Sequence, residues 1–134
     1  LLRREALACE RWNLLHPDQP QQIPYVTRIL ADQPFPVVAT GDYMKSVPDQ
    51  IARWVPGGLR PLGTDGFGRS EARAELRDYF EIDARYTALA ALQELARIGK
   101  FERSKLADAV KSLGINPEKL DPVAEPKPET LQEK

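Results

Sequence analysis

The sequence is poor in the residues that most often carry chemistry, with one cysteine, one histidine and one methionine among 134 positions. Cys9 alone excludes an internal disulfide, which fits a reducing compartment, and one Cys with one His cannot form a structural zinc site. No apolar run approaches the roughly 18 residues that cross a bilayer, and residues 1–5 lack the apolar region of a signal peptide. The start without an initiator Met is expected of a fragment or a processed product.

The chain has almost no net charge. The 19 Lys and Arg stand against 20 Asp and Glu, which gives a formal net charge of −1 and a pI near 5.9. Such a chain has no overall field to attract nucleic acid or anionic lipid, so we expect no nucleic-acid partner and no membrane partner. The expected location is cytoplasmic, in line with the single cysteine. Its 42% hydrophobic residues and its length fit one globular domain.

Apolar periodicity, prolines and glycines divide the chain into short elements. Short β-branched or apolar runs predict strands at 37–40 and 59–64, the second weakened by Pro61. We expect Asp42, Ser70 and Asp83 to be helix N-caps, and Gly99 stands where a left-handed residue ends a helix. Helical spacing predicts helices over 1–15, 43–55, 70–80, 84–98 and 102–113, with a short helix near 24–30 in the proline-rich segment 16–36.

This order of elements predicts an α/β fold class. Two strands separated by a helix are typical of a right-handed βαβ unit, but a sheet of two strands is not stable by itself. We therefore expect a partial three-layer domain over residues 1–121, with a mostly parallel sheet that lacks its first strands and with extra C-terminal helices. Prolines and charges dominate residues 122–134, which predicts a flexible tail.

The Gly66-Phe67-Gly68-Arg69-Ser70 segment joins a strand to a helix, a position at which phosphates often bind. The dinucleotide fingerprint needs a third glycine where Glu71 stands, and the lysine of a Walker loop is absent. The alternative is a tight turn with positive φ at the glycines and Phe67 turned inward. Arg69, Arg73 and Arg77 alternate with acidic residues, which indicates a solvated or interface face rather than a nucleic-acid stripe.

Few other residues suggest chemistry. His16 has no assured nucleophile or acid beside it, so its expected role is capping or packing in a helix-ending turn. Cys9 lies on the apolar side of the first helix and is expected to be buried. Asp42 and Asp65 both follow strand ends, where ligands of parallel sheets lie. They could hold a metal or act as acid and base, while helix capping and turn formation explain them as well.

Several segments carry a resemblance to one family. They are 10–17 (ERWNLLHP), 24–26 (PYV), 42–45 (DYMK), 62–70 (LGTDGFGRS), 76–77 (LR) and 79–83 (YFEID). In order, over about residues 1–121, they resemble the C-terminal region of the homodimeric, bacterial-type pyruvate dehydrogenase, the thiamine-dependent decarboxylating component of the pyruvate dehydrogenase complex. The Gly66-Phe67-Gly68-x-Ser70 element is shared more widely with transketolase-like enzymes.

The resemblance implies a three-domain subunit in which thiamine diphosphate and magnesium bind between the first two domains at a homodimer interface. This chain would belong to the third domain, an α/β domain like the transketolase C-terminal domain. The family's catalytic glutamate, magnesium ligands and active-site histidines lie in segments absent here. We therefore assign no catalytic, cofactor-binding or metal residue, and expect no cofactor on this segment.

The function implied is that of a non-catalytic part of the decarboxylase, which serves subunit stability, dimer packing and complex assembly in pyruvate metabolism after glycolysis. The expected partners are the remaining domains of the subunit, the second subunit and the dihydrolipoyl acyltransferase core. The alternative is a free-standing interaction module from a truncated gene, without catalysis. A Gly68→Val substitution should disrupt folding or docking. The candidate intersubunit or interdomain contacts are Trp12, His16, Asp65, Phe67 and Arg69.

Overall fold

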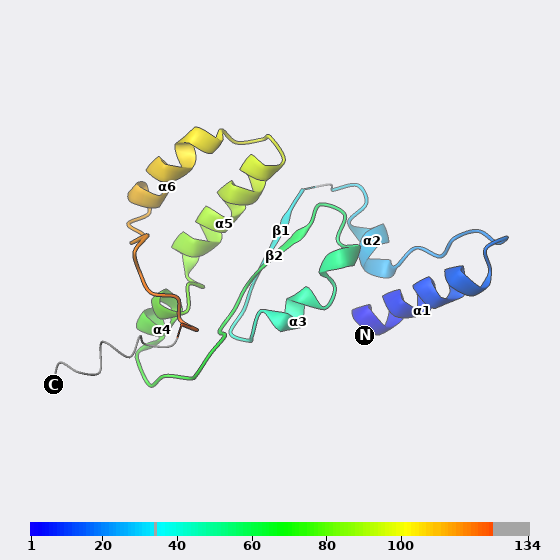
Figure 1. Cartoon of the computed structure of the whole chain (residues 1–134), viewed down its shortest axis with the longest axis horizontal. Coiled ribbons are helices and arrows are strands. Elements are labelled where there is room, and N and C mark those ends of the chain that lie inside the picture. Colours follow the sequence, from blue (N-terminus) through cyan, green and yellow to red (C-terminus); the bar gives the residue numbers. More distant parts are fainter. Residues whose placement is uncertain (34, 125–134) are drawn as a thin grey trace.

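The computed structural model describes residues 1–33 and 35–124 (Figure 1). Helices precede, separate and follow two short strands. Within the described residues, no helix is both long and apolar enough to cross a bilayer. The elements are α1 (Leu2–Leu15), α2 (Tyr25–Ile29), β1 (Val37–Thr40), α3 (Ser46–Asp49), the 3₁₀ turn η1 (Ala52–Trp54), β2 (Leu59–Leu62), α4 (Arg73–Tyr79), α5 (Ala84–Arg97), the 3₁₀ turn η2 (Arg103–Lys105) and α6 (Leu106–Ser112).

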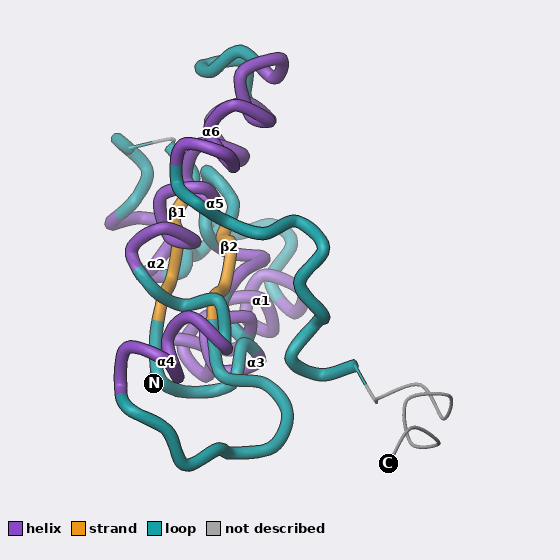
Figure 2. Tube along the Cα trace, turned by 90° about the vertical axis from the view of Figure 1, so that its left-hand side faces the viewer, coloured by secondary structure: helices purple, strands orange, loops and turns teal. Residues whose placement is uncertain are grey.

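The two strands form a parallel sheet, as the sequence predicts. Val37 pairs with Leu59 and Thr40 with Leu62. Figures 1 and 2 show the strands side by side at the centre, with α5 over one face and the N-terminal helices beyond the other. The Thr40 and Thr87 hydroxyls, 3.2 Å apart, join β1 to α5. Helices on both faces of parallel strands confirm the α/β class.

The main core lies on the sheet face opposite α5. Trp54 is its largest buried side chain, 8% exposed, and its indole Nε1 donates a 2.8 Å hydrogen bond to Glu10 of α1. Arg53 forms an ion pair with the same carboxylate, so Glu10 fastens α1 to the end of η1. The buried cluster comprises Ala6, Val26, Trp54 and Val55, with Leu30, Val37, Ile51 and Leu59 packed against it.

Helix α5 begins and ends where its sequence predicts. The Asp83 carboxylate accepts hydrogen bonds from the amides of Arg85 (2.8 Å) and Tyr86 (3.1 Å), as an N-cap does. Gly99 adopts φ +73°, and the Lys100 amide donates to the Leu95 carbonyl (2.8 Å). This left-handed ending satisfies carbonyls that would otherwise lack partners.

The predicted helix over 43–55 is wrong. Pro48 lacks an N–H and its ring would clash with the carbonyl four residues earlier, so the helix begins only at Ser46. After Asp49 the backbone tightens into the η1 turn. Asp42 does not cap it: the Lys45 amide donates to Asp65 instead, at 2.9 Å. Among the described residues no side chain caps α3, and its N-cap residue Lys45 is instead held by a residue twenty positions further along the chain.

Ser70 is also not an N-cap, because α4 begins at Arg73 with Ala72 as its N-cap residue. The Ala72 amide donates to the Glu75 carboxylate (3.3 Å), which is one half of a capping box. The predicted tail, 122–134, falls largely outside the described residues. Within the described part, the Tyr79 hydroxyl donates to the Pro122 carbonyl (3.3 Å).

The chain exposes more surface than a folded protein of its mass. Its accessible area is 10298 Å², whereas a compact monomer of 15.1 kDa exposes roughly 7,100 Å². If residues 125–134 exposed as much as an unfolded chain of their mass, they would account for roughly 1,600 Å². An excess of well over 1,000 Å² would remain on the described body. This body therefore has faces that lack a cover.

Candidate functional site

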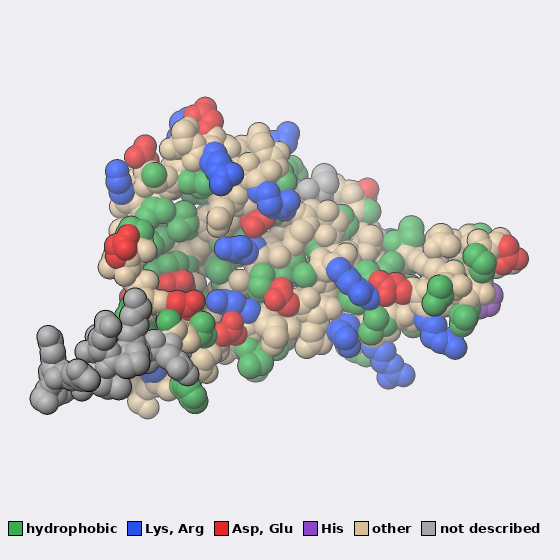
Figure 3. All heavy atoms as spheres, viewed as in Figure 1, with side chains coloured by type: hydrophobic (Ala, Val, Ile, Leu, Met, Phe, Trp, Pro, Cys, Tyr) green, Lys and Arg blue, Asp and Glu red, His purple; other side chains and the backbone are tan. Residues whose placement is uncertain are grey.

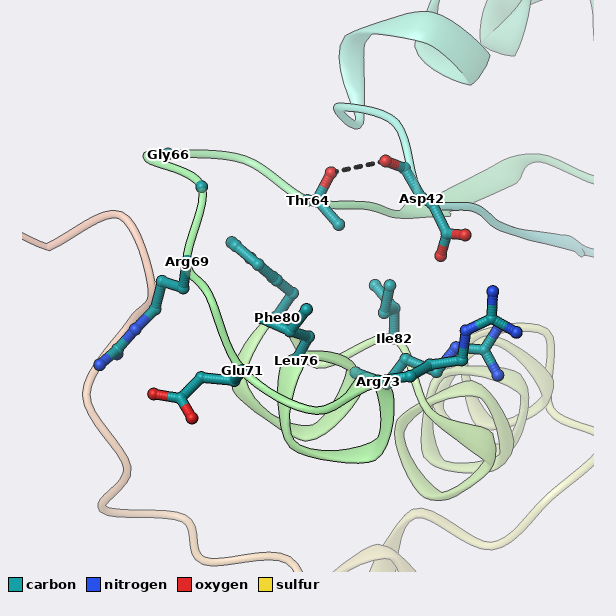
Figure 4. A pocket seen from close by; sticks show the side chains of 11 residues that line it. Asp42, Thr64, Gly66, Arg69, Glu71, Arg73, Leu76, Phe80 and Ile82 are labelled. Carbon is teal, nitrogen blue, oxygen red and sulfur yellow. Dashed lines mark hydrogen bonds between the residues drawn. The ribbon is translucent and has the colours of Figure 1, made fainter.

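The carboxyl ends of β1 and β2 bring Asp42 and Asp65 to the same edge, as the sequence predicts. The Thr64 hydroxyl donates to the Asp42 carbonyl at 2.9 Å (Figure 4), and the Thr64 amide donates to the Tyr43 carbonyl at 3.0 Å. The Asp65 carboxylate turns toward Lys45, whose ammonium lies 3.7 Å away. Asp65 thus ties the two strand ends together, which is the capping and turn role rather than one half of a carboxylate pair.

A cavity of about 530 Å³ opens beside this edge. Figure 4 shows Leu76, Phe80 and Ile82 side by side on one wall, facing Thr64 and Asp42. Phe80 and Ile82 are buried, 8% and 7% exposed. The lining residues are Asp42, Thr64, Gly66, Gly68, Arg69, Glu71, Arg73, Leu76, Arg77, Phe80 and Ile82.

Three arginines from the predicted interface face reach this cavity. The Arg69 guanidinium lies over the Tyr79 ring, 4.3 Å from its centroid, and Figure 4 shows its end directed away from the apolar wall. Arg73 and Arg77 line the cavity from α4. An apolar wall with a cationic rim suits a partner surface that presents both apolar and acidic groups.

The described residues do not fit the magnesium and thiamine diphosphate that the resemblance implies for the whole enzyme. Over residues 1–33 and 35–124, no three His, Cys, Asp or Glu side chains gather in a way that could hold a metal ion. The cavity supplies arginines and two separate carboxylates, Asp42 and Glu71, whereas magnesium prefers several oxygen ligands around one point. We derive no reaction step through these groups.

Trp12 and His16 lie at the C-terminal end of α1, and neither residue lines the cavity. Their rings stack with centroids 4.6 Å apart, and His16 Nδ1 lies 2.9 Å from the Trp12 carbonyl oxygen. His16 is the C-cap residue of α1, which confirms the capping and packing role. Cys9 is buried, as predicted, at 7% exposure.

The inward orientation predicted for Phe67 is wrong, because its side chain is 95% exposed. Gly66 does adopt positive φ, at +91°. A Cβ on Gly68, however, would meet no atom within 4 Å, whereas one on Gly66 would lie 3.3 Å from Pro122 and Val123, so the Gly68 side of the turn is open. The folding part of the Gly68→Val prediction therefore finds no support, and the docking part stays a prediction.

The structure also exposes apolar residues that the sequence did not single out. Val47 is 50% exposed, beside Tyr43 at 76% and Met44 at 55%. The break in the predicted 43–55 helix turns them outward next to a hollow of about 210 Å³. On α1, Leu14 and Leu15 are 77% and 54% exposed, and Figure 3 shows apolar side chains along this projecting helix. Pro48 follows the first segment and Pro17 the second, and these prolines were the sequence signal that each helix is interrupted there.

Comparison with known proteins places these features in context. Residues 5–83 match the family model described as "Transketolase-like TK C-terminal domain". The chain is 48% identical over 123 residues, 91% of its length, to the "Pyruvate dehydrogenase E1 component" of Haemophilus influenzae and, over an equal span, to that of Pseudomonas aeruginosa. It is 44% identical over 122 residues to the Escherichia coli K12 protein of the same name. The chain spans 14% of the length of each of these relatives.

Proposed function

Because the chain belongs to the family of transketolase-like C-terminal domains, we propose that it is the non-catalytic C-terminal part of a thiamine diphosphate-dependent pyruvate dehydrogenase E1 component. The whole enzyme would decarboxylate pyruvate and pass the acetyl group to a lipoyl group in the cytoplasm. This part would stabilise the subunit, support packing of the homodimer and help to assemble the complex.

The observation that carries the proposal is the 48% identity over 91% of the chain to only 14% of the relative's length. Such a match is expected of one domain in a larger polypeptide. The excess accessible surface supports it, since exposed apolar area on a monomer usually marks a face that another part covers.

The contacts we assign fall into two patches. The arm patch comprises Trp12 and His16 with the exposed Leu14 and Leu15 on α1. The loop patch comprises Asp65, Phe67 and Arg69 in the segment between β2 and α4, of which Arg69 lines the cavity. Full burial of an exposed Phe stabilises by roughly 1.5–3 kcal/mol, so Phe67 at the tip of its turn is the strongest single anchor. The partners are the remaining domains, the second subunit and the dihydrolipoyl acyltransferase core.

Thiamine diphosphate and magnesium would bind to segments of the enzyme outside this chain. When bound, thiamine diphosphate supplies the electron sink for decarboxylation. Within the chain, the Asp65–Lys45 link and the Trp54–Glu10 link hold the loop and arm patches in place. The chain would thus contribute by holding its contact patches in position, and its side chains would take no part in proton transfer.

The experiment is carried out in a full-length E1 polypeptide that contains this chain. Phe67→Ser should weaken subunit association in analytical ultracentrifugation, whereas Leu120→Ser, at an 80% exposed position outside both patches, should not. Asp42→Asn and Glu71→Gln, the carboxylates of the cavity, should leave kcat for pyruvate decarboxylation unchanged. A tenfold or larger fall in kcat with the dimer intact would mean that the chain supplies catalysis, and it would overturn the proposal.

The exposed patches would equally serve the free-standing interaction module. The mass of the native polypeptide separates the two, read with an antibody against residues 60–100. A band several times larger than 15.1 kDa supports the E1 domain, and a band at 15.1 kDa supports the module.

A further inference from the structure

A separate hollow of about 380 Å³ shares no lining residue with the cavity at the carboxyl ends of the strands. It lies where α5 packs against β2, η2 and α6, and each of these elements contributes at least one residue to its wall. No residue of the arm patch or the loop patch lines it. Sites for small molecules enclose roughly 300–1,000 Å³, so this hollow is large enough to hold one.

Three arginines from different elements line this hollow. Arg60 belongs to β2, Arg97 to α5 and Arg103 to η2, and Glu94 is the one carboxylate among the lining residues. The wall therefore carries two positive charges in excess, although the whole chain has a formal net charge of −1. Figure 3 shows Lys and Arg side chains gathered over α5. Over the part of the chain that the structure describes, neither Arg60 nor Arg103 forms an ion pair, so both guanidinium groups are available to an anion.

Arg97 is held in a fixed position at the wall. Its Nε donates to the Glu94 carboxylate at 2.6 Å, and its Nη2 donates to the Gly57 carbonyl at 3.0 Å. Gly58 has φ +87°, and a Cβ there would lie 2.9 Å from the Arg97 Nη2, so this glycine leaves the space that the guanidinium occupies. The two bonds use two of the five N–H donors of an arginine. Arg97 can therefore offer its remaining donors to an anion with little further loss of side-chain freedom.

The chemistry of this wall matches a phosphate group. A guanidinium presents a planar fork of donors that binds phosphate oxygens in pairs, as Arg60 and Arg103 can. The excess of two positive charges suits a phosphate ester, which carries close to two negative charges, better than a carboxylate, which carries one. Ala96 and Leu106 add apolar surface to the same wall. The ligand that fits is thus a phosphate ester with a small apolar body.

We propose that this arginine hollow, lined by Arg60, Arg97 and Arg103, is a binding site for a small phosphate ester. Arg60 and Arg103 bind the phosphate oxygens from β2 and η2, Arg97 adds its fixed charge, and the body of the ester contacts Leu106. The bound phosphate joins η2 to α5 and β2, so the ligand stabilises the folded chain. The proposal depends on residues of this chain alone and does not rest on the proposed function.

The experiment is a calorimetric titration of the full-length polypeptide that contains this chain, at about pH 8, where a phosphate ester carries two negative charges. Thiamine diphosphate and magnesium are present throughout, so that a cofactor site outside this chain takes no probe. Phenyl phosphate should bind at one site per chain with a Kd of about 1 mM or tighter. Phenyl sulfate has a similar shape but a single charge, and it should bind at least about fivefold more weakly. Inorganic phosphate should also bind more weakly, since it lacks the ring that contacts Leu106.

Variants place the site. Arg103 is exposed, so Arg103→Gln should leave the fold intact and weaken phenyl phosphate binding about tenfold or more, as loss of a hydrogen bond to a charged group does. Arg60→Gln should have a similar effect from β2. Arg103→Lys keeps the charge but not the fork of donors, so it should recover only part of the loss. Lys111→Gln is the matched control: it removes the same charge from an exposed position of α6 that does not line the hollow, and the Kd should change less than about twofold.

Any of three results would overturn the proposal. The first is wild-type protein that shows no saturable binding of phenyl phosphate up to about 10 mM, which would mean that another part of the polypeptide fills the hollow. The second is an unchanged Kd in both Arg60→Gln and Arg103→Gln, which would place the bound probe elsewhere. The third is phenyl sulfate or inorganic phosphate that binds as tightly as phenyl phosphate, which would exclude a doubly charged ester as the ligand.

Discussion

Replacing Asp83 by alanine tests the reasoning about α5 most directly. The Asp83 carboxylate accepts the first free amides of the helix, from Arg85 and Tyr86, at 2.8 and 3.1 Å. Loss of such a cap typically destabilises by about 1 kcal/mol, within a range of 0.5–2. The ion pair with Arg85 adds little, since that guanidinium is 39% exposed. For a chain of this size the Tm should fall by roughly 3–6 °C.

The dependence on pH follows from the charge of the same group. Partial burial of Asp83 disfavours its ionised form, but the hydrogen bonds from Arg85 and the Tyr86 amide and the guanidinium charge outweigh this, so the pKa of Asp83 is lowered. A lowered folded-state pKa stabilises fully above the unfolded value, near 3.9, and this stabilisation disappears as the pH falls through the folded value. The charge-dependent part of the difference between wild type and variant should therefore persist from pH 7 to 5 and vanish in more acid solution.

Urea unfolding followed by circular dichroism at several pH values measures both effects. Asp83→Asn is the matched control, because asparagine is as good an N-cap as aspartate but has no charge. The Asp83→Asn variant should lose less than half of the unfolding free energy that the Asp83→Ala variant loses. Equal stabilities of wild type, Asp83→Ala and Asp83→Asn at pH 7 would show that the cap contributes nothing, and the account of where α5 begins would have to be abandoned.

Three further predictions concern Gly63 after β2, Glu10 of α1 and the Cys9 thiol. A Cβ on Gly63 would lie 2.3 Å from the Tyr43 carbonyl oxygen, so Gly63→Ala should destabilise by about 2 kcal/mol or more, while Gly68→Ala should stay within about 0.5 kcal/mol; equal thermal melts would contradict this. Glu10→Ala removes the acceptor of the buried Trp54 indole and should destabilise by about 1 kcal/mol and speed exchange of the α1 amides, whereas Glu10→Gln keeps an acceptor. Burial, then the hydrogen bond to Glu5 and its negative charge, raise the pKa of the Cys9 thiol, so its reaction with a disulfide reagent at pH 7.5 should be at least about tenfold slower than that of a free thiol and should rise steadily with pH.

Local rules were sufficient wherever the determining partner lies close in sequence. Asp83 caps amides two and three positions away, and Gly99 ends the same helix, so both ends of α5 were predictable. The strands were predictable because apolar runs between turn residues suit a sheet that is covered on both faces. Periodicity could not place α3, because the amide of its N-cap residue Lys45 is held by Asp65, which only the sheet brings near.

The candidate site was less predictable for a different reason. Turn geometry explains the positive φ of Gly66 but says nothing about which way Phe67 points. The inward orientation assumed that the chain covers its own aromatic residues, and the described residues leave Phe67 95% exposed. His16, by contrast, has its partner Trp12 one helical turn away, so its packing role could be anticipated.

Pro61 also limits how far the chain could polymerise through its sheet. If two chains paired through the outer edges of their β1 strands, the merged sheet would present a β2 strand on each outer side. Each of these strands carries a Pro61 with no N–H to offer, so a third chain would find no complete ladder to extend. Association of chains through their sheet edges would therefore stop at two chains, and Pro61 disfavours the growth of fibrils.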